Sequence, residues 1–531
     1  MRPLLAWAAL ALLLPATRPQ ESVSVADALR RVRPQDPPPA GSTAALQAAR
    51  NEVESFQVIV RAGPEPLKGV TAEAGDLKGP GVIPVRNVAL FREHYVEVKK
   101  PSPKSKEGAG WYPDALIPLS AAKGAPFDVP AGTNQPLWVD VAVPKDAPPG
   151  EYAGTVTVSA GGRRVGAADV RLTVWDFALP DVPSMRSNFG SLGRRVAKGH
   201  KMDANAPELR ALERRYAEAM AAHRLSPPIP GHLYPRSKPD GSVDPSETHA
   251  ALKEWIETLR VNSFPLHLQG RDPAGKDRER NVKHLQSIWA YLKENGWEKM
   301  ACVYVLDEPN DADAYEQVRQ RAKLIHEAQP GIKVLCTEQP TPSKPEWGTL
   351  VGSVDIWVPL WPLFEEKSGA ERLAAGEELW SYTALCQGAK GKDTPFWQLD
   401  FPLLNYRVPA WTSWRYGMTG LLYWTTVFWE KPEEIWTNPL TYRDAYNMEG
   451  ALFYPGAGAG IDGPVSSMRL KAVRDGMEDY EYFRLLAERE GAEKARAKVM
   501  EIARSWTDWD ADPSALLRAR TEIGRRLVRT K

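Results

Sequence analysis

The pattern of secondary structure along the chain changes once, near residue 180, and this change constrains the fold more than any other feature. Before it, short alternating or β-branched runs such as Ser55–Val60 and Leu137–Val143 are separated by glycine and proline. Short strands at this spacing, with proline-rich loops, are typical of a β-sandwich. We therefore expect an N-terminal β-sandwich domain over residues 22–180, followed by a stiff linker at Leu179–Pro183.

After the linker, short apolar strands alternate with helices of 3.6-residue periodicity. The strand candidates are Ser187–Ser191, Pro228–Tyr234, Ser263–Gln269, Met300–Leu306, Lys333–Thr337, Val354–Leu360, Glu378–Ala384 and Gly420–Thr426. Eight such units over roughly 270 residues predict a (β/α)₈ TIM barrel. A doubly wound open sheet is the alternative, but no strand is followed by the dinucleotide fingerprint G-x-G-x-x-G. We expect a multidomain chain with the catalytic barrel over residues 185–489 and a helical C-terminal extension over residues 490–531.

The composition excludes several function classes. The chain has 531 residues, enough for two or three domains, and a formal net charge of +1, so it has no global field to attract nucleic acid. Its three cysteines, Cys302, Cys336 and Cys386, are isolated within apolar segments and are expected to be core residues. No spacing of cysteine or histidine predicts a metal site, and no cofactor is indicated.

The N-terminus has the pattern of an export signal. Arg2 precedes the apolar run Leu4–Leu14, which is too short to span a membrane. We expect residues 1–20 to be a signal peptide and the protein to be periplasmic or extracellular, with an uncleaved anchor as the alternative. The sequence has no second apolar stretch of spanning length.

A pair of adjacent acids, Asp307 and Glu308, follows the fourth strand candidate, with Pro309 directly after them. Barrel active sites lie at the carboxyl ends of the strands, where these acids are expected. Because neighbouring side chains of an ideal strand point to opposite faces, both acids enter one pocket only if the chain bends here. Two carboxyls held close repel, so one stays protonated and the other ionised, as glycoside hydrolysis requires. The alternative is that both acids cap the helix starting near Asp311.

Aromatic and histidine residues lie in or near the other strand candidates. The chain contains 19 tryptophans, an excess that suits a sugar-binding groove because pyranose rings stack on flat aromatic faces. Core packing is the alternative for each of them taken singly. The candidates for substrate binding are Tyr382, Trp380, Trp424, Trp429, Trp357, His232 and His267.

Several motifs, in one order along most of the chain, resemble glycoside hydrolase family 123 and related proteins with an uncharacterised C-terminal hydrolase-like domain. They are the segments 51–57, 111–114, 134–139 and 149–152 in the N-terminal part, and 307–309, 379–382, 450–456, 467–470 and 474–480 in the C-terminal part.

This resemblance implies a β-sandwich followed by a (β/α)₈ domain, and an exo-acting, retaining β-N-acetylgalactosaminidase or hexosaminidase. In such enzymes the 2-acetamido group of the substrate is the nucleophile. The family pattern implies that Glu308 is the general acid and base and that Asp307 orients the acetamido group. A tyrosine hydroxyl commonly assists the acetamido group as well, and Tyr382 is the candidate for it. A glycan containing N-acetylhexosamine is the expected partner.

Two alternatives remain open at this point. The first is a glycosidase of another specificity, in which a conventional second carboxylate such as Asp355, Asp400 or Glu430 takes part. The second is a non-catalytic carbohydrate-binding surface protein, which the tryptophan excess and the sandwich would also suit.

Overall fold

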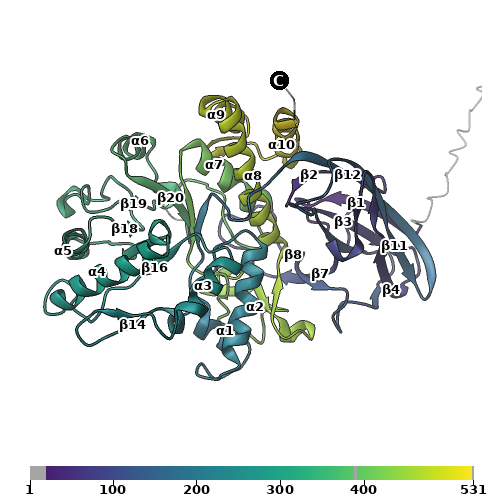
Figure 1. Ribbon diagram of the computed structural model, residues 1–531. Coiled ribbons are helices and arrows are strands. Elements are labelled where there is room, and N and C mark those ends of the chain that lie inside the picture. Colours follow the sequence, from purple (N-terminus) through teal and green to yellow (C-terminus); the bar gives the residue numbers. More distant parts are fainter. Residues whose placement is uncertain (1–19, 388–390, 529–531) are drawn as a thin grey trace, which may run out of the picture.

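The computed structural model describes residues 20–387 and 391–528 and has a β-sandwich beside a barrel (Figure 1). One sheet of the sandwich is antiparallel throughout, in the order β1 (Ser22–Asp27), β3 (Val53–Arg61), β10 (Asn134–Ala142), β7 (Val88–Val98) and β8 (Gly110–Pro118). The other sheet has the order β2 (Thr43–Arg50), β12 (Arg163–Ala178), β11 (Gly150–Ala160), β4 (Leu67–Ala74) and β9 (Phe127–Val129), and β5 (Leu77–Lys78) and β6 (Val82–Ile83) extend it.

Strand β10 shows how the sandwich is attached to the rest of the chain. Leu137, Val139 and Val141 point into the core between the two sheets. The residues between them alternate to the opposite face, where Trp138 joins the core shared with the barrel. Both faces of this strand are therefore buried, and its polar residue Asp140 faces the second domain.

The second domain is a nearly closed barrel, and this confirms the predicted fold. Seven parallel strands form one sheet in the order β13 (Arg186–Asn188), β21 (Gly420–Tyr423), β20 (Glu378–Thr383), β19 (Ile356–Trp357), β18 (Lys333–Cys336), β17 (Ala301–Leu306) and β16 (Phe264–Leu266). Helices cover the outside of this sheet: α1 (Gly193–Gly199), α2 (Leu209–Ala222), α3 (His249–Thr258), α4 (Arg278–Glu294), α5 (Ala312–Ala328), α6 (Glu366–Ala374), α7 (Leu404–Arg415) and α8 (Met468–Glu490).

The predicted second strand, Pro228–Tyr234, is wrong. These residues form no strand in the structure and contain only a short 3₁₀ turn at Gly231–Leu233. Proline has no N–H to donate to a ladder, and positions 227, 228 and 230 are all proline. Ser226 bridges the gap instead, because its N–H donates to Ser187 Oγ (2.8 Å) and its hydroxyl donates to the Ser263 carbonyl (3.1 Å).

The remaining elements are small hairpins and the C-terminal helices. The hairpins pair β14 (Arg236–Ser237) with β15 (Val243–Asp244), β22 (Leu440–Tyr442) with β23 (Tyr446–Asn447), β24 (Phe453–Pro455) with β25 (Pro464–Ser466), and β26 (Ala503–Ser505) with β27 (Asp508–Trp509). The C-terminal helices are α9 (Ala492–Met500) and α10 (Pro513–Val528).

Helix α8 lies between the barrel and the sandwich, and charged groups are buried along it (Figure 1). Lys471 Nζ lies 2.7 Å from an oxygen of Asp140 on β10, and Arg474 lies 3.3 Å from the other oxygen. Although burial favours the neutral acid, these two cations hold the pKa of Asp140 well below its usual range. The interface between the domains is thus a network of compensated charges as well as an apolar core.

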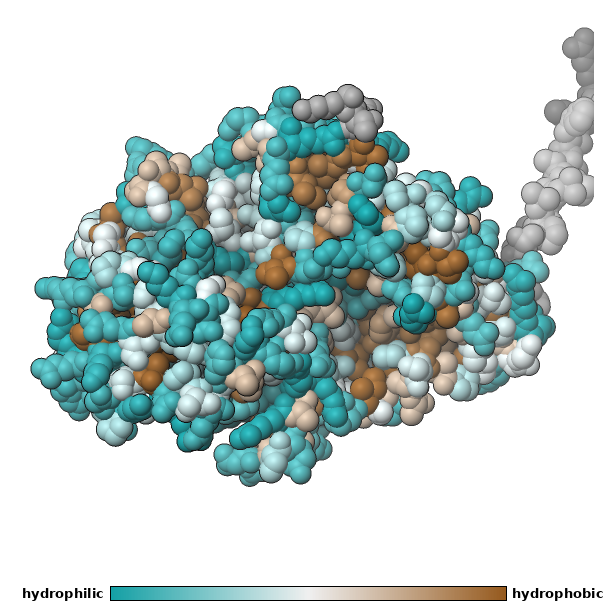
Figure 2. All heavy atoms as spheres, in the orientation of Figure 1, coloured by the Kyte–Doolittle hydropathy of each residue, from teal (hydrophilic) through white to brown (hydrophobic). Residues whose placement is uncertain are grey.

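The exposed face in Figure 2 is mostly hydrophilic, and its hydrophobic residues form small separate patches. Within the described residues, no helix combines the length and the apolar character needed to cross a membrane. The three cysteines are buried and free, as expected for core residues.

Candidate active site

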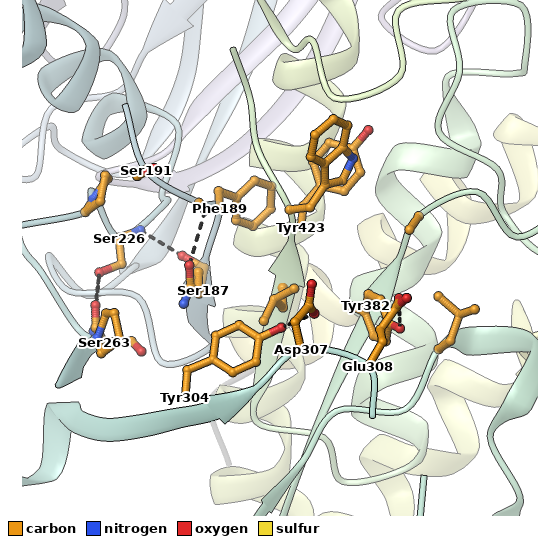
Figure 3. A pocket seen from close by; sticks show the side chains of 18 of the residues that line it. Ser187, Phe189, Ser191, Ser226, Ser263, Tyr304, Asp307, Glu308, Tyr382 and Tyr423 are labelled. Atoms are coloured by element: carbon orange, nitrogen blue, oxygen red, sulfur yellow. Dashed lines mark hydrogen bonds between the residues drawn. The ribbon is translucent and has the colours of Figure 1, made fainter. Parts of the chain in front are cut away.

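A cavity of about 680 Å³ opens at the carboxyl ends of the barrel strands (Figure 3). Asp307 and Glu308, which follow β17, both line it. The lining also includes Tyr304, Tyr382 and Trp424, which come from β17, β20 and the end of β21. The two acids therefore share one pocket, as the sequence requires if they are to act together.

The bend that this arrangement needs is at Glu308, whose φ angle is +41°. A residue other than glycine is strained in this left-handed region, and such strain persists only where the surroundings enforce it. Thr337, after β18, supplies part of that enforcement. Its hydroxyl accepts a hydrogen bond from the Glu308 N–H (2.8 Å) and donates one to Asp307 Oδ1 (2.9 Å).

The pair does not cap the following helix, which settles that alternative. Helix α5 is capped by Asp311, whose Oδ1 accepts from the Ala314 N–H at 2.7 Å. The carboxyl groups of Asp307 and Glu308 are held in the cavity lining by other contacts, with Thr337, Tyr304 and Tyr382.

Each acid accepts a hydrogen bond from one tyrosine. The Tyr304 hydroxyl donates to Asp307 Oδ1 (2.6 Å), and the Tyr382 hydroxyl donates to Glu308 Oε1 (2.5 Å; Figure 3). Burial, and then the neighbouring carboxylate, raises the pKa of both phenols. Both tyrosines therefore stay protonated and act as permanent donors.

A third acid, Glu449, lines the cavity and was missed in the sequence. Its Oε1 accepts from the Trp424 indole N–H (2.9 Å) and the Tyr423 hydroxyl (3.2 Å), and its Oε2 accepts from Gln398 Nε2 (2.5 Å). Burial raises the pKa of this carboxyl. In the sequence, the one indication of a role for Glu449 is its position directly before the family motif 450–456.

Trp424 lies in the cavity wall because Gly450 leaves room for its ring. A Cβ atom at Gly450 would lie 2.3 Å from the indole, and the φ angle there is +71°. The guanidinium of Arg195 lies 5.6 Å from the ring centre, and Tyr442 packs against the ring edge.

The other proposed substrate-binding residues are divided between the cavity and the core. His267 lines the cavity and a neighbouring hollow of about 400 Å³, which His232 also lines. Trp380 is fully buried inside the barrel beneath Tyr382, because residues two apart share a face. Trp357 faces the outer helices and Trp429 packs on Tyr216, and both are buried outside the cavity lining.

The three acids named as possible second carboxylates also lie outside the cavity lining. Asp355 is at the amino end of β19 and accepts from His326 (2.9 Å). Asp400 is fully buried against the sandwich, and Glu430 contributes its carbonyl to Lys198. In the described part of the chain, no three histidine, cysteine or acidic side chains are grouped as a metal site would require.

Two family models match the chain. The model of the glycoside hydrolase 123 N-terminal domain matches residues 29–160, and the model of the glycoside hydrolase 123 catalytic domain matches residues 269–486. Together they cover about two-thirds of the chain. No curated protein matches it.

Among solved structures, the chain is similar to a family 123 glycoside hydrolase from Clostridium perfringens, described in connection with glycolipid glycan hydrolysis. The identity is 13%, the TM-score is 0.70, and the match covers 96% of this chain and 98% of that one. A xyloglucanase from Bacteroides ovatus also matches, at 9% identity and a TM-score of 0.30, over 86% of this chain and 100% of that one. The first likeness supports the whole two-domain fold, and the second is too distant to add to it.

Proposed function

The chain belongs to glycoside hydrolase family 123 and so hydrolyses glycosidic bonds, and from this premise we propose that it is an exo-acting, retaining β-N-acetylhexosaminidase. We take N-acetylgalactosamine as its first candidate sugar. The observation that carries the proposal is the convergence of Asp307 and Glu308 in one cavity through the left-handed bend at Glu308.

In the proposed first step, the acetamido oxygen of the substrate attacks the anomeric carbon while Glu308 protonates the departing glycosidic oxygen. The bond to the leaving group breaks and an oxazolinium ion forms. Asp307 accepts a hydrogen bond from the acetamido N–H and stabilises the positive charge that develops. In the second step Glu308 takes a proton from water while the water oxygen attacks the anomeric carbon. The bond from that carbon to the acetamido oxygen breaks, which opens the oxazolinium ring and gives a product of retained configuration.

The tyrosine contacts support this division of roles. Tyr304 occupies one lone pair of Asp307 Oδ1, which leaves Oδ2 as an acceptor for the acetamido N–H. Tyr382 binds Glu308 Oε1, which leaves Oε2 to carry the transferred proton. In this arrangement Tyr382 orients the acid and base, and it reaches the acetamido group only by changing partner.

The test compares three aryl β-glycosides: N-acetylgalactosaminide, N-acetylglucosaminide and plain galactoside. We expect turnover of one or both acetamido substrates and inhibition by the matching thiazoline, which resembles the oxazolinium ion. Turnover of the plain galactoside alone would show that another specificity applies.

Variants then separate the two acids. We expect Glu308→Gln to lower kcat by about 10²–10⁴-fold with a poor leaving group, and by much less with dinitrophenol, which needs no proton. Asp307→Asn should lower the rate with both leaving groups. If Glu308→Gln lowers both rates equally, Glu308 is not the proton donor.

We further propose that the protein is exported through its N-terminal segment, on the basis of Arg2 and the apolar run Leu4–Leu14. Cell fractionation followed by N-terminal sequencing of the mature protein tests this. A cytoplasmic protein that retains residue 1 would contradict it.

A further inference from the structure

We propose that the sandwich domain is part of the sugar-binding site, because its residue Ser102 positions Glu449 and Trp424 in the cavity wall. The inference rests on the proposed glycosidase function and adds a second domain to it. Ser102 lies between β7 and β8 of the sandwich, in the segment 99–109 that reaches the barrel loops.

Glu449 is a buried carboxyl in this wall, and its position depends on hydrogen bonds from neighbouring residues. It is 1% exposed, and all three of its side-chain donors, Trp424, Tyr423 and Gln398, are neutral. No cation of the described residues forms an ion pair with it. A buried carboxyl held only by neutral donors depends on each of them being well placed. The indole of Trp424, which lines the cavity, is oriented by the same contact.

The loop that carries Glu449 is strained. Arg443, Asp444 and Met448 have φ angles of +52°, +45° and +58°, which residues other than glycine adopt only at a cost in free energy. Arg443 lines the cavity itself. A loop with three such residues needs contacts that hold it in one conformation.

The sandwich segment supplies those contacts. The Ser102 hydroxyl accepts from the Asn447 N–H (2.9 Å), and Asn447 Nδ2 donates to the Lys100 carbonyl (2.9 Å). Lys100 Nζ donates to the Asp444 carbonyl at 2.7 Å. The strained loop is therefore attached to the sandwich at two points, at Asp444 within its turn and at Asn447 after it.

Ser102 also holds the segment 398–400, which contacts Glu449 from another part of the chain. Its N–H and hydroxyl donate to the two oxygens of Asp400, at 2.6 and 2.7 Å, and Asp400 is fully buried. Leu399, one residue earlier, donates its N–H to the Asn447 carbonyl at 2.9 Å. Gln398 precedes Leu399 and donates to Glu449. One serine therefore fixes both segments that converge on Glu449.

The experiment measures KM and kcat of Ser102→Ala, Ser102→Thr and Glu449→Gln in the full-length protein, with whichever of the three aryl glycosides the wild type cleaves fastest. We expect Ser102→Ala to raise KM about fivefold or more, and to change kcat less, because a loosened wall weakens sugar binding. Ser102→Thr keeps the hydroxyl and should restore KM to within about twofold.

A double variant tests whether Ser102 acts through Glu449. If it does, Ser102→Ala adds nothing to the KM of Glu449→Gln, whereas independent effects multiply. Lys100→Ala provides a second measurement, because this side chain is exposed and its loss does not threaten folding. We expect it to raise KM about twofold.

Ser55→Ala is the matched control. Ser55 is also buried at the interface between the domains, where its hydroxyl donates to Asp140 at 2.6 Å, but it is far from the cavity lining. It should lower Tm and leave KM unchanged. An unchanged KM in Ser102→Ala, or a multiplicative double variant, would overturn the inference. Failure of the proposed function itself would instead appear in the substrate preference of the wild type.

Discussion

At the scale of single residues, the site depends on tyrosines that cannot ionise near neutral pH. Tyr382 and Tyr304 are buried beside carboxyl groups, and both circumstances raise the pKa of a phenol. Each tyrosine therefore keeps its proton and donates to its acid at neutral pH.

Tyr382→Phe removes the donor to Glu308 without changing the shape of the cavity. In the proposed first step Glu308 becomes a carboxylate as it releases its proton, and a hydrogen bond to an ionised group contributes about 1.5–3 kcal/mol. We therefore expect kcat to fall about 10–150-fold. Tyr480→Phe is the control, because that hydroxyl donates to the Met418 carbonyl (3.0 Å) outside the cavity. Equal kcat values for the two variants would contradict the assigned role of Tyr382.

Glu338, which follows β18, makes stability depend on pH. Burial, with a contribution from Glu308, raises the pKa of Glu338 to about 7. Because the folded-state pKa lies above the unfolded one, its contribution is full below about pH 4.5 and is lost as pH rises through about 7. Relative to Glu338→Gln, the wild type should lose about 3 kcal/mol between these limits. Urea unfolding at several pH values measures this, and parallel stability curves would refute it.

At the scale of elements, the turn between β17 and α5 contains acids with two different roles, capping of the helix and lining of the cavity. Asp311 caps α5, while Asp307 and Glu308 enter the cavity. The separation is possible because the bend at Glu308 lies between the end of β17 at Leu306 and the N-cap of α5 at Asp311.

Asp311→Ala should therefore destabilise the protein by about 1 kcal/mol, the usual cost of a lost N-cap, and leave kcat within about twofold of the wild type. Asp307→Ala should have the opposite profile, with a large fall in kcat. Thermal unfolding and steady-state kinetics on both variants test this pairing. A catalytic loss in Asp311→Ala would mean that the cap also positions the acids.

The amino-acid sequence predicts those elements whose side-chain pattern is regular. It predicts the strands around Val303 and Leu335 and the need for a bend at Glu308, because burial imposes a strict period on strands and helices. It misassigns residues 228–234, where apolar residues between prolines resemble a strand but lack the donors of one. It also cannot tell Trp357, which faces the helices, from Trp424 in the cavity, because an indole suits either place.

Glu449 and Ser102 are not predictable from such patterns. Both lie in irregular segments, and their partners are far away in the chain: Ser102 and Asn447 are 345 residues apart. Only the packing of two domains brings them together. In the proposed site, residues of both domains are therefore needed, and the sandwich is more than an accessory to the barrel.

At the scale of the whole molecule, stability depends on each charge buried at the interface between the domains keeping its partner, because an unpaired buried charge is costly. Asp140→Asn would leave Lys471 and Arg474 without their shared partner, at a cost of about 3–5 kcal/mol. Denaturant unfolding should show this loss. The exposed pair Lys145–Asp181 (2.6 Å) is the control, and Asp181→Asn should cost far less. Similar losses in the two variants would contradict the structural role of the buried network.

The gap at the second strand position has a consequence for motion. A ladder would join β13 to β16 by several backbone hydrogen bonds, whereas here each bond between the two edges involves a side chain, that of Ser187, Ser226 or Asn262. These bonds do not form the continuous backbone ladder that joins the other adjacent strands, so we expect the amides along this seam to exchange with solvent sooner than those within the ladders. Pro228 and Ile229 of the same segment line the cavity. We therefore expect the mouth of the barrel to widen at this seam when a bulky glycan enters, while Asp307 and Glu308, which follow β17, keep their positions.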